Sequence, residues 1–390
     1  MKKKKQTAFD ALISEITKCS DFRIAGRTDY PLNEILFLTI CGSMADSTTY
    51  EQIYDFGIMR LDWLKKYLPY KNGIPSHDTI NRVLSLLNPQ EFGKLLTNWA
   101  CYDLELSDGS IIALDGKWIS KSATIKQQQT KKIDGGKQAI LMVNAYCVNL
   151  NKCLTSICVE AKNVEKQAFE SIVKLLDVSK CIVTIDAAGC YRDTVMNIRS
   201  NEAEYVIGLK KNQKLLYELT ERLFANQKGK SSRNERDRGH GRIETRKCTV
   251  LTIKEIEKEY PSTIETFSSW KDLKSLIQIE SSRKTISTGK EETFKRYYIS
   301  SLTLSPTKMG KIVRDHWGIE NGLHWVLDVI MGEDQSRKRN ENAAANYSII
   351  KKVALNNLKA FSDKKVSIKR KMKRCLMSTE YLEKVLNGNA

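Results

Sequence analysis

The sequence predicts an α/β protein in which a mixed β-sheet is covered by helices, with an all-helical domain before it. The first hundred residues carry apolar side chains at helical spacing. From residue 110 onward, β-prone runs and helical segments follow in the order β-β-β-α-β-α-β-α. Three meander strands followed by crossover units are typical of a mixed sheet with helices on its faces. With 390 residues, the chain is long enough for two or three domains.

The N-terminal part, residues 1–107, is expected to be a helical domain. Its best-marked helix begins after Ser76, a good N-cap residue. The apolar stripe of that helix consists of Ile80, Val83, Leu84 and Leu87. The other face carries His77, Asn81 and Arg82, which is compatible with a helix-turn-helix that reads DNA. An ordinary helical bundle explains the same pattern equally well.

The sheet is expected within a catalytic domain at residues 108–376. Its strands are expected at 111–115, 138–148, 153–160, 181–186 and 204–209. Its helices are expected at 164–176, 191–200 and 212–224. The first and fourth strands each end in a carboxylate, Asp115 and Asp186. In the ribonuclease-H-like arrangement, which has this element order, those two strands are neighbours, so we expect the two carboxylates at one edge of the sheet.

A β-rich insertion is expected within the catalytic domain at residues 226–305, because the alternating rhythm stops there. Its basic segment 227–241 is expected to be a loop. Strands are expected to follow at 248–253, 275–281 and 296–302. Residues 377–390 are expected to form a helical tail.

A long helix is predicted from Ser305 toward Met331, because an N-cap residue is followed by Pro at the first helical position. Glu320, His324 and Asp328 recur every four residues and therefore line one face of that helix. A carboxylate there is able to reach the edge of the sheet. On spacing alone, the choice of that acid stays open among Glu320, Asp328, Glu333 and Asp334.

Positive charge is concentrated in two segments. Lys and Arg outnumber Asp and Glu by 64 to 46, a formal net charge of +18. Residues 226–247 hold eight Lys/Arg against three acids, and residues 337–374 hold thirteen against two. Solvated helix surfaces explain one such run, whereas two concentrated blocks favour double-stranded DNA as a partner. The arginines of these blocks that we expect to contact DNA are Arg242, Arg246, Arg337 and Arg339.

The remaining composition narrows the class of protein. The ten cysteines include no CxxC pair and no Cys/His spacing suited to zinc, which favours reduced core cysteines in a cytoplasmic protein. No signal peptide is recognisable, and the apolar run at residues 35–41 is too short to span a bilayer, so no membrane partner is expected. A Gly-rich phosphate loop is absent, so no nucleotide cofactor is expected.

Two strand-end aspartates and one glutamate from a late helix make a ligand set for two Mg2+ ions, with Mn2+ as a substitute. Such a pair activates a water or a 3′-hydroxyl and stabilises the departing oxygen of a phosphodiester displacement. Each acid alone has a plainer explanation, because Asp-Gly after an apolar run is more often a tight turn. Lys117, two residues after Asp115, is expected either to hold a DNA phosphate or to face solvent.

Several stretches of the chain resemble one family. They are Asp115–Lys117, Thr184–Cys190, Leu209–Gln213, His240–Arg246, His316–Asn321, His324–Val329 and Glu333–Asp334. They are similar to the DDE transposases of bacterial insertion sequences, and most to the H-repeat-associated group linked to Rhs elements. Tyr30–Leu32 and Gly73–Thr79 match the preceding helical domain of this group, so the resemblance spans nearly the whole chain.

The resemblance implies a ribonuclease-H-like fold with a β insertion before the last acid, and metal-dependent cutting and joining of DNA. The matching catalytic and metal-binding triad is Asp115, Asp186 and Glu320. The interval from Asp186 to Glu320 is 134 residues (320 − 186), long enough for the insertion.

Several positions depart from the family pattern. Where the group usually has an Arg-Gly pair after Asp-Gly-Lys, this chain has Ser120-Lys121, so binding near Asp115 is expected to differ. Related transposases carry a Tyr and an Arg before the Glu and a Lys after it, where this chain has Val313, His316 and Leu327. Those phosphate contacts therefore do not carry over, and Arg314 is a candidate substitute that we expect to contact DNA.

We predict from these observations a transposase that cuts DNA at the inverted repeats of an insertion sequence and joins the ends to target DNA. Because two ends must be held together, we expect a dimer on DNA. Two alternatives stay open: a ribonuclease-H-like nuclease that never joins DNA, and a domesticated or inactive DNA-binding protein.

Overall fold

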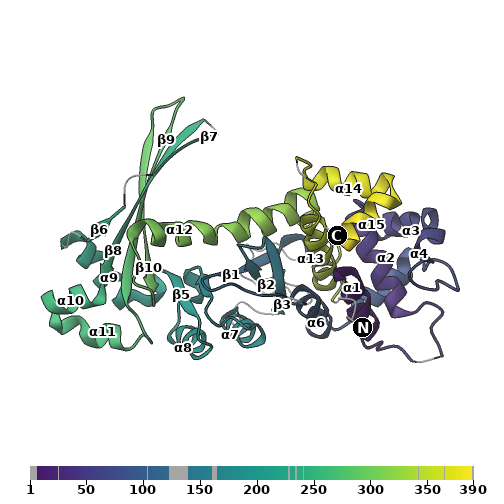
Figure 1. Cartoon of the computed structure of the whole chain (residues 1–390), viewed down its shortest axis with the longest axis horizontal. Helices are drawn as coiled ribbons and strands as arrows, with labels where there is room; N and C mark the ends of the chain where they lie inside the picture. The colour runs from purple at the N-terminus through teal and green to yellow at the C-terminus, as the bar shows by residue number, and fades with distance from the viewer. Residues whose placement is uncertain are drawn as a thin grey trace, which may run out of the picture.

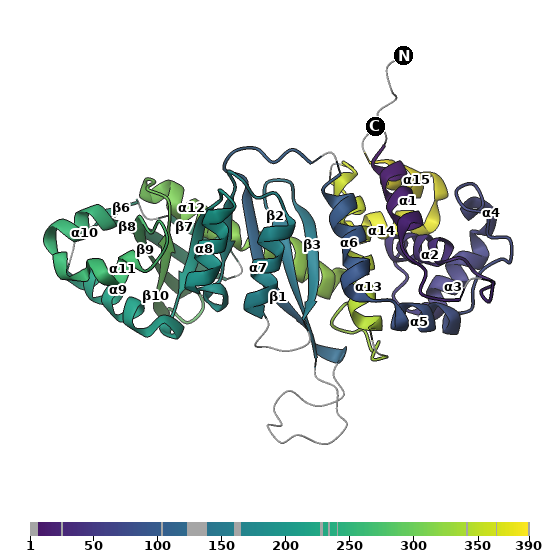
Figure 2. The same ribbon diagram turned by 90° about the horizontal axis from the view of Figure 1, so that it is seen from below.

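The computed structural model describes residues 7–24, 26–102, 104–122, 139–159, 165–226, 229–232, 235–239, 241–340, 342–363 and 365–388. The molecule is elongated, with a bundle of helices at one end, a sheet with helices on its faces in the middle, and long strands that extend away from the body at the other end (Figure 1). The same three parts follow one another along the long axis when the molecule is turned (Figure 2). His240, which belongs to one of the motifs above, lies outside the described residues.

Six helices form the N-terminal part. They are α1 (Ala8–Lys18), α2 (Leu32–Met44), α3 (Tyr50–Met59), α4 (Leu61–Leu64), α5 (His77–Leu86) and α6 (Pro89–Ala100). The N-cap predicted at Ser76 is confirmed, because its hydroxyl accepts a hydrogen bond from the Thr79 N–H at 3.3 Å. The predicted apolar stripe of α5 is buried, while His77 and Arg82 are exposed. A contact between this face and DNA stays a prediction.

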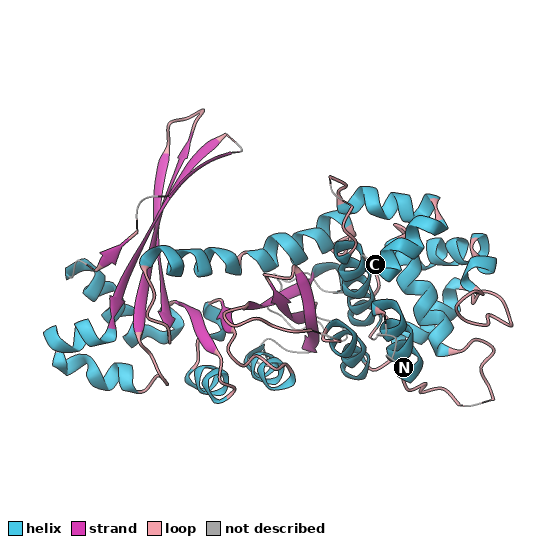
Figure 3. Ribbon diagram, viewed as in Figure 1, coloured by secondary structure: helices cyan, strands magenta, loops and turns pink. Residues whose placement is uncertain are grey.

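The predicted order of strands and helices in the sheet is confirmed. The elements are β1 (Ile111–Ile119), β2 (Ile140–Cys147), β3 (Lys152–Val159), α7 (Glu165–Leu175), β4 (Ile182–Ile185), α8 (Arg192–Ser200), β5 (Glu204–Leu209) and α9 (Lys214–Asn226). β1, β2 and β3 pair antiparallel, whereas β4 pairs parallel with β1 and with β5. The spatial order β3-β2-β1-β4-β5 is the ribonuclease-H-like arrangement. Helices α7 and α8 lie below the sheet and α12 (Pro306–His316) lies above it (Figure 3).

The sheet continues beyond β5 into the β-rich insertion. The strands of that part are β6 (Lys230–Ser231), β7 (Glu235–Gly239), β8 (Arg242–Thr252), β9 (Ser275–Thr285) and β10 (Glu291–Ser300). β10 pairs with β5, β9 with β10, and β8 with β9, so the insertion is built onto the main sheet. We call β7, β8, β9 and β10 the β arm, because their outer parts extend away from the body (Figure 1).

Two expectations about the insertion were wrong. Segment 227–241 was expected to be a loop, but it contains β6 and β7, and all five residues of β7 are exposed. A strand exposed on both faces has no apolar alternation, so the sequence gives no sign of it. Ile253 was expected to end a strand, but it begins helix α10 (Ile253–Glu259), because Thr252 and Glu255 form a capping box there. A short helix, α11 (Ile264–Ser268), follows before β9.

The long helix predicted from Ser305 toward Met331 is confirmed, with a change in its winding. Ser305 caps α12 by accepting a hydrogen bond from the Lys308 N–H at 3.5 Å, and Pro306 occupies the first turn. After α12 the chain continues through two π-helical segments, η6 (Glu320–His324) and η7 (Val326–Ile330). π-Helical turns are rare in proteins overall, and those that occur are often at functional sites.

The last three helices pack against the first ones. They are α13 (Ala343–Ala360), α14 (Ile368–Met377) and α15 (Thr379–Asn387). Helix α13 is buried on nearly all sides and contacts α2, α5, α6 and β3. N-terminal and C-terminal helices therefore share one hydrophobic core, while the domain boundaries at 107 and 376 stay predictions. Within the described residues, no helix combines the length and the apolar character needed to cross a membrane.

Candidate functional site

Asp115 lies in the middle of β1, at the point where β4 stops. The parallel register pairs Leu114 with Ile185, the last residue of β4. The expectation that β1 ends at Asp115 was wrong, because the strand continues to Ile119 while pairing with β2. β1 is therefore paired with strands on both sides up to Leu114, and only with β2 from Asp115 onward.

Asp186 follows β4 directly and turns the chain at the same edge. Its carboxylate accepts a hydrogen bond from the Ala188 N–H at 2.8 Å, which caps a short turn, η3 (Ala187–Gly189). Gly208 of β5 lies against this turn: a Cβ on it would meet the Ala187 nitrogen at 3.0 Å and the Asp186 carbonyl carbon at 3.3 Å. The absence of a side chain at Gly208 lets the turn that carries Asp186 lie close to the sheet.

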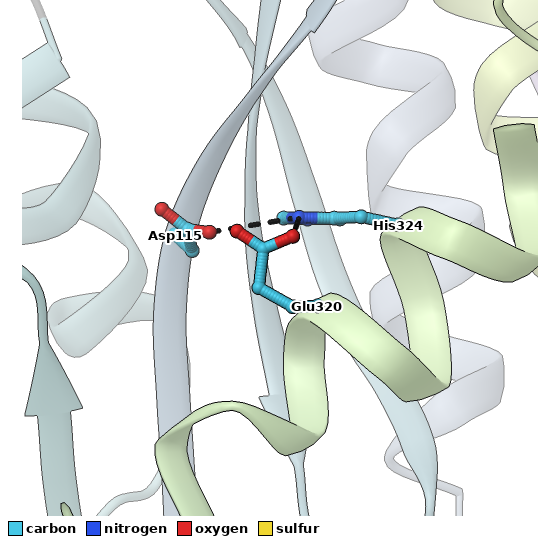
Figure 4. A group of neighbouring side chains, drawn as sticks. All are labelled: Asp115, Glu320 and His324. Atoms are coloured by element: carbon cyan, nitrogen blue, oxygen red, sulfur yellow. Dashed lines mark ion pairs between the residues drawn. The ribbon is translucent and has the colours of Figure 1, made fainter. Parts of the chain in front are cut away.

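Glu320 and His324 reach the same place from the other side, on η6. Their side chains converge on Asp115 (Figure 4). The Nδ1 atom of His324 lies 3.5 Å from a carboxylate oxygen of Asp115 and 3.5 Å from one of Glu320. One ligand atom from each of these three residues lies within 4.8 Å of the others. The structure thus brings together residues that are 205 positions apart (320 − 115).

The three acids border one cavity of about 320 Å3 between the sheet and the long helix. Asp115, Asp186 and Glu320 line it, together with His316 and the cationic side chains of Lys210, Lys295 and Arg296. His316 is anchored to the sheet, because its Nδ1 atom lies 2.9 Å from the Thr184 hydroxyl. Burial lowers the pKa of His316.

The charges of the acids interact strongly. Burial, together with the negative charges of Glu320 and Asp186, raises the pKa of Asp115 from its usual value to about 8. The hydrogen bond from His324 lowers the pKa of Glu320. An acid whose pKa is raised by burial and neighbouring carboxylates lacks a compensating positive charge, which a cation in the cavity would supply.

The donor set fits a hard divalent cation. Carboxylate oxygens are the ligands that Mg2+ and Mn2+ prefer, and three of them border this cavity. Asp186 lines the same cavity but is outside the tight group of Asp115, Glu320 and His324. The geometry is therefore compatible with the predicted triad.

Lys117 has carboxylate partners in the interior. The alternative that Lys117 faces solvent was wrong, because its side chain is only 8% exposed and its ammonium lies 2.6 Å from Asp328 and 3.5 Å from Asp334. Burial opposes its charge, but the hydrogen bond to Asp328 prevails and raises the pKa of Lys117. Glu333, another candidate third acid, is buried, and the positive charges of Lys351 and Lys352 oppose burial and lower its pKa. The DNA role expected for Lys117 stays a prediction.

Three of the predicted DNA-binding arginines meet in one cleft between α12 and the β arm. This cleft has a volume of about 670 Å3, and Arg242, Arg246 and Arg314 line it. Each is partly neutralised: Arg242 and Arg246 pair with Glu244, and Arg314 lies 3.4–3.5 Å from Asp237 and Glu235. The other cationic side chains of the cleft are Lys247, Arg283 and Arg296.

The other two predicted arginines lie in the loop between η7 and α13. Arg337 and Arg339 are both exposed. The Arg339 guanidinium donates a hydrogen bond to the Lys121 carbonyl oxygen at 3.2 Å, which brings this loop next to the end of β1. Between them, Lys338 lies over the rings of Tyr50 and Tyr347, at 4.5 and 3.9 Å from their centroids.

Sequence reasoning missed several residues of the site. Arg283, Lys295 and Arg296 come from β9 and β10, outside the two basic blocks. The pairing of β10 with β5 places Lys295 and Arg296 at the cavity of the acids, and Arg283 lines the neighbouring cleft. For His324 the sequence held a signal, because it recurs with Glu320 at helical spacing. The contacts of His316 and His324 could not be assigned from the sequence.

The fold and the cavity together define a ribonuclease-H-like protein with a cluster of carboxylates beside a cationic cleft. Comparison with known proteins identifies the family within that class. The family model described as "Transposase DDE domain" matches residues 106–357, and the model "DDE_Tnp_1-associated" matches residues 13–100. The chain belongs to this family of transposases.

Two relatives match over nearly their full length. One is "Putative transposase YncI" of Escherichia coli O157:H7, 38% identical over 97% of this chain and 95% of the relative. The other is "H repeat-associated putative transposase YhhI" of E. coli (strain K12), 34% identical over 97% and 98%. They confirm the resemblance to the H-repeat-associated group. A solved piggyBac transposase synaptic complex with hairpin DNA is similar at a TM-score of 0.49 and 12% identity, covering 98% of this chain and 82% of that one.

Proposed function

We propose that this chain is a cytoplasmic transposase that cuts DNA at the inverted repeats of an insertion sequence and joins the ends to target DNA. Mg2+ is the proposed cofactor and Mn2+ a substitute. The observation that carries the proposal is the cavity bordered by Asp115, Asp186 and Glu320, next to a cleft with six Lys and Arg side chains against three acids.

Asp115, Asp186 and Glu320 are the residues that would hold the ions. When bound, a pair of divalent ions supplies an activated nucleophile and offsets charge on the departing oxygen. Two displacements at phosphorus are needed: water opens a strand at the element end and leaves a 3′-hydroxyl, and that hydroxyl then attacks the target strand. Lys210 and Lys295, which border the cavity, are suited to hold the phosphate oxygens, because phosphoryl transfer depends mostly on positioning and charge neutralisation.

The cleft beside α12 is the proposed path of the double-stranded DNA. Arg242, Arg246 and Arg314 would contact its backbone from one side of the acids, and Arg337 and Arg339 from the other. Arg242, Arg246 and Arg314 now pair with acids and Arg339 with a backbone carbonyl, so binding would exchange those contacts for phosphates. A dimer on DNA is proposed because two element ends must be held together.

The test is a cleavage and strand-transfer assay on labelled DNA that carries the element ends. Asp115→Asn and Glu320→Gln should each abolish cleavage with Mg2+ while leaving the affinity for uncut DNA within about twofold, since phosphate contacts from Lys and Arg supply that affinity. Asp193→Asn is the matched control, because Asp193 is a surface acid paired with Lys166 at 2.5 Å, and it should cut normally.

The same assay separates the alternatives. A substrate with a pre-cut 3′ end that is never joined to target DNA indicates a nuclease without joining activity. DNA binding without any cleavage in Mg2+ or Mn2+ indicates an inactive binding protein, and one shorter relative carries the name "Inactive transposase YbfQ". Normal cutting by Asp115→Asn would refute the proposed site.

A further inference from the structure

A row of buried polar side chains crosses the sheet beneath the acids. Asp115 of β1 is paired with Asn144 of β2, and Asn144 with Ser156 of β3. Residues paired in this way point to the same face of the sheet. His324 lies over the row, with one ring nitrogen toward the carboxylates and the other, Nε2, 3.2 Å from the Asn144 side-chain nitrogen. Asn144, Ser156 and His324 are 0%, 2% and 5% exposed.

The orientation of the Asn144 amide is fixed by its neighbours. Its nitrogen donates to the Met142 carbonyl oxygen at 3.2 Å, and its oxygen accepts from the Ser156 hydroxyl at 2.8 Å. If the amide were turned over, two oxygen atoms would face each other at 3.2 Å at Met142. The amide nitrogen has two hydrogens. One of them bonds the Met142 carbonyl oxygen, and the other points at His324.

This orientation determines where the His324 ring carries its proton. A nitrogen that receives a hydrogen bond from an amide must offer a lone pair, so Nε2 is the unprotonated one. The proton is then on Nδ1, which faces Asp115 and Glu320 at 3.5 Å. The Nδ1–H group of His324 then faces both carboxylates, and the ring offers no lone pair on the side where a metal would bind.

We propose that Asn144 and Ser156 hold His324 as a positioning residue that stays out of the metal ligand set, and that this makes the site selective for hard cations. The inference rests on the proposed function, because it assumes that Asp115 and Glu320 hold the ions. Imidazole nitrogen favours Zn2+ and similar ions, whereas an all-oxygen set favours Mg2+ and Mn2+. An Nδ1–H group at 3.5 Å from both carboxylates would also orient them, as groups one step outside a metal site usually do.

The first test determines which ring nitrogen of His324 carries the proton in the wild-type protein. The chain has four histidines, so long-range proton–nitrogen NMR spectra of the labelled rings are simple, and His324→Gln identifies the signal. We expect protonated Nδ1 and bare Nε2, unchanged when Mg2+ is added. Protonated Nε2, or loss of the Nδ1 proton on adding Mg2+, overturns the inference.

The second test reverses the polarity of the row. In Asn144→Asp, the new carboxylate would accept a hydrogen bond from a protonated Nε2, which turns the Nδ1 lone pair toward the site, so Zn2+ affinity should rise by about tenfold or more relative to Mg2+. Thr155→Val is the matched control, because Thr155 is the neighbouring buried residue of β3 and bonds the Thr97 hydroxyl at 2.7 Å instead. An unchanged Zn2+ preference in Asn144→Asp overturns the inference.

The outcomes of these tests distinguish a failure of this inference from a failure of the proposed function. A protein that cuts and joins DNA but carries the His324 proton on Nε2 overturns the inference alone. A protonated Nδ1 in a protein that never cuts DNA, with or without metal, overturns the proposed function.

Discussion

Replacing Lys117 by Met distinguishes two roles of this side chain, a buried ion pair with Asp328 and a contact with a DNA phosphate. The substitution would leave Asp328 facing the interior without its partner at 2.6 Å. Removing one member of a buried pair costs about 3–5 kcal/mol. Because the Asp328 side chain is still 23% exposed, the lower end, about 3 kcal/mol, is the expected loss in free energy of unfolding. For a chain of 390 residues that corresponds to a melting temperature lower by about 4 °C.

The loss should depend on pH with a defined sign. Burial raises the pKa of Asp328 even in the wild type, against the lowering effect of Lys117. Without Lys117 that pKa rises further above its value in the unfolded chain. The folded variant then binds more protons than the unfolded chain, so its stability increases as pH falls. The gap between Lys117→Met and wild type should therefore be larger at pH 8 than at pH 5.

Thermal unfolding and DNA binding at several salt concentrations are the measurements. Lys121→Met is the control, because Lys121 is exposed near the end of the same strand, and it should change stability by less than about 0.5 kcal/mol. The double variant Lys117→Met/Asp328→Leu should recover most of the loss, since both charges are gone. A Lys117→Met protein with wild-type stability and a salt dependence reduced by about one phosphate contact would refute the ion-pair reasoning.

Three further outcomes are expected. Arg242→Ala should weaken DNA binding and lower the slope of log affinity against log salt by about 1, measured by fluorescence anisotropy, and an unchanged slope excludes a phosphate contact. EDTA should stop cleavage but not DNA binding, with Mn2+ restoring cleavage, so cutting in EDTA would exclude metal-dependent chemistry. Burial lowers the pKa of Lys338 from 10.5 to about 7. Because the unfolded chain binds that proton up to higher pH, wild-type stability should rise from pH 7 to pH 9, and the rise should be smaller in Lys338→Met, as judged by melting temperature.

Most of the fold follows from local patterns. Apolar β-prone runs located β1 to β5, and the N-caps at Ser76 and Ser305 marked two helix starts that the structure has. The β arm was only partly predicted, because β7 is exposed on both faces and leaves no periodic signal. The end of β1 was misplaced since Asp-Gly usually signals a turn, and only the pairing with β2 shows that the strand continues.

The site was predicted from the resemblance more than from spacing. Spacing alone could not separate Glu320 from Asp328, since both lie on one face of the helix. Their partners distinguish them: His324 and Asp115 lie beside Glu320, and Lys117 lies beside Asp328. The contact of His324 with Asn144 joins residues 180 positions apart, and no local pattern announces it.

The central position of α13 has a consequence for shortened copies of the gene. This helix is buried on nearly all sides and fills the space between the first helices and β3. A product that stops before Ala343 would keep every proposed ligand of the site but expose the apolar walls around the missing helix. We expect such fragments to be degraded by proteases. The product of a truncated reading frame would then not accumulate, and it would not compete with an intact copy for the ends of the element.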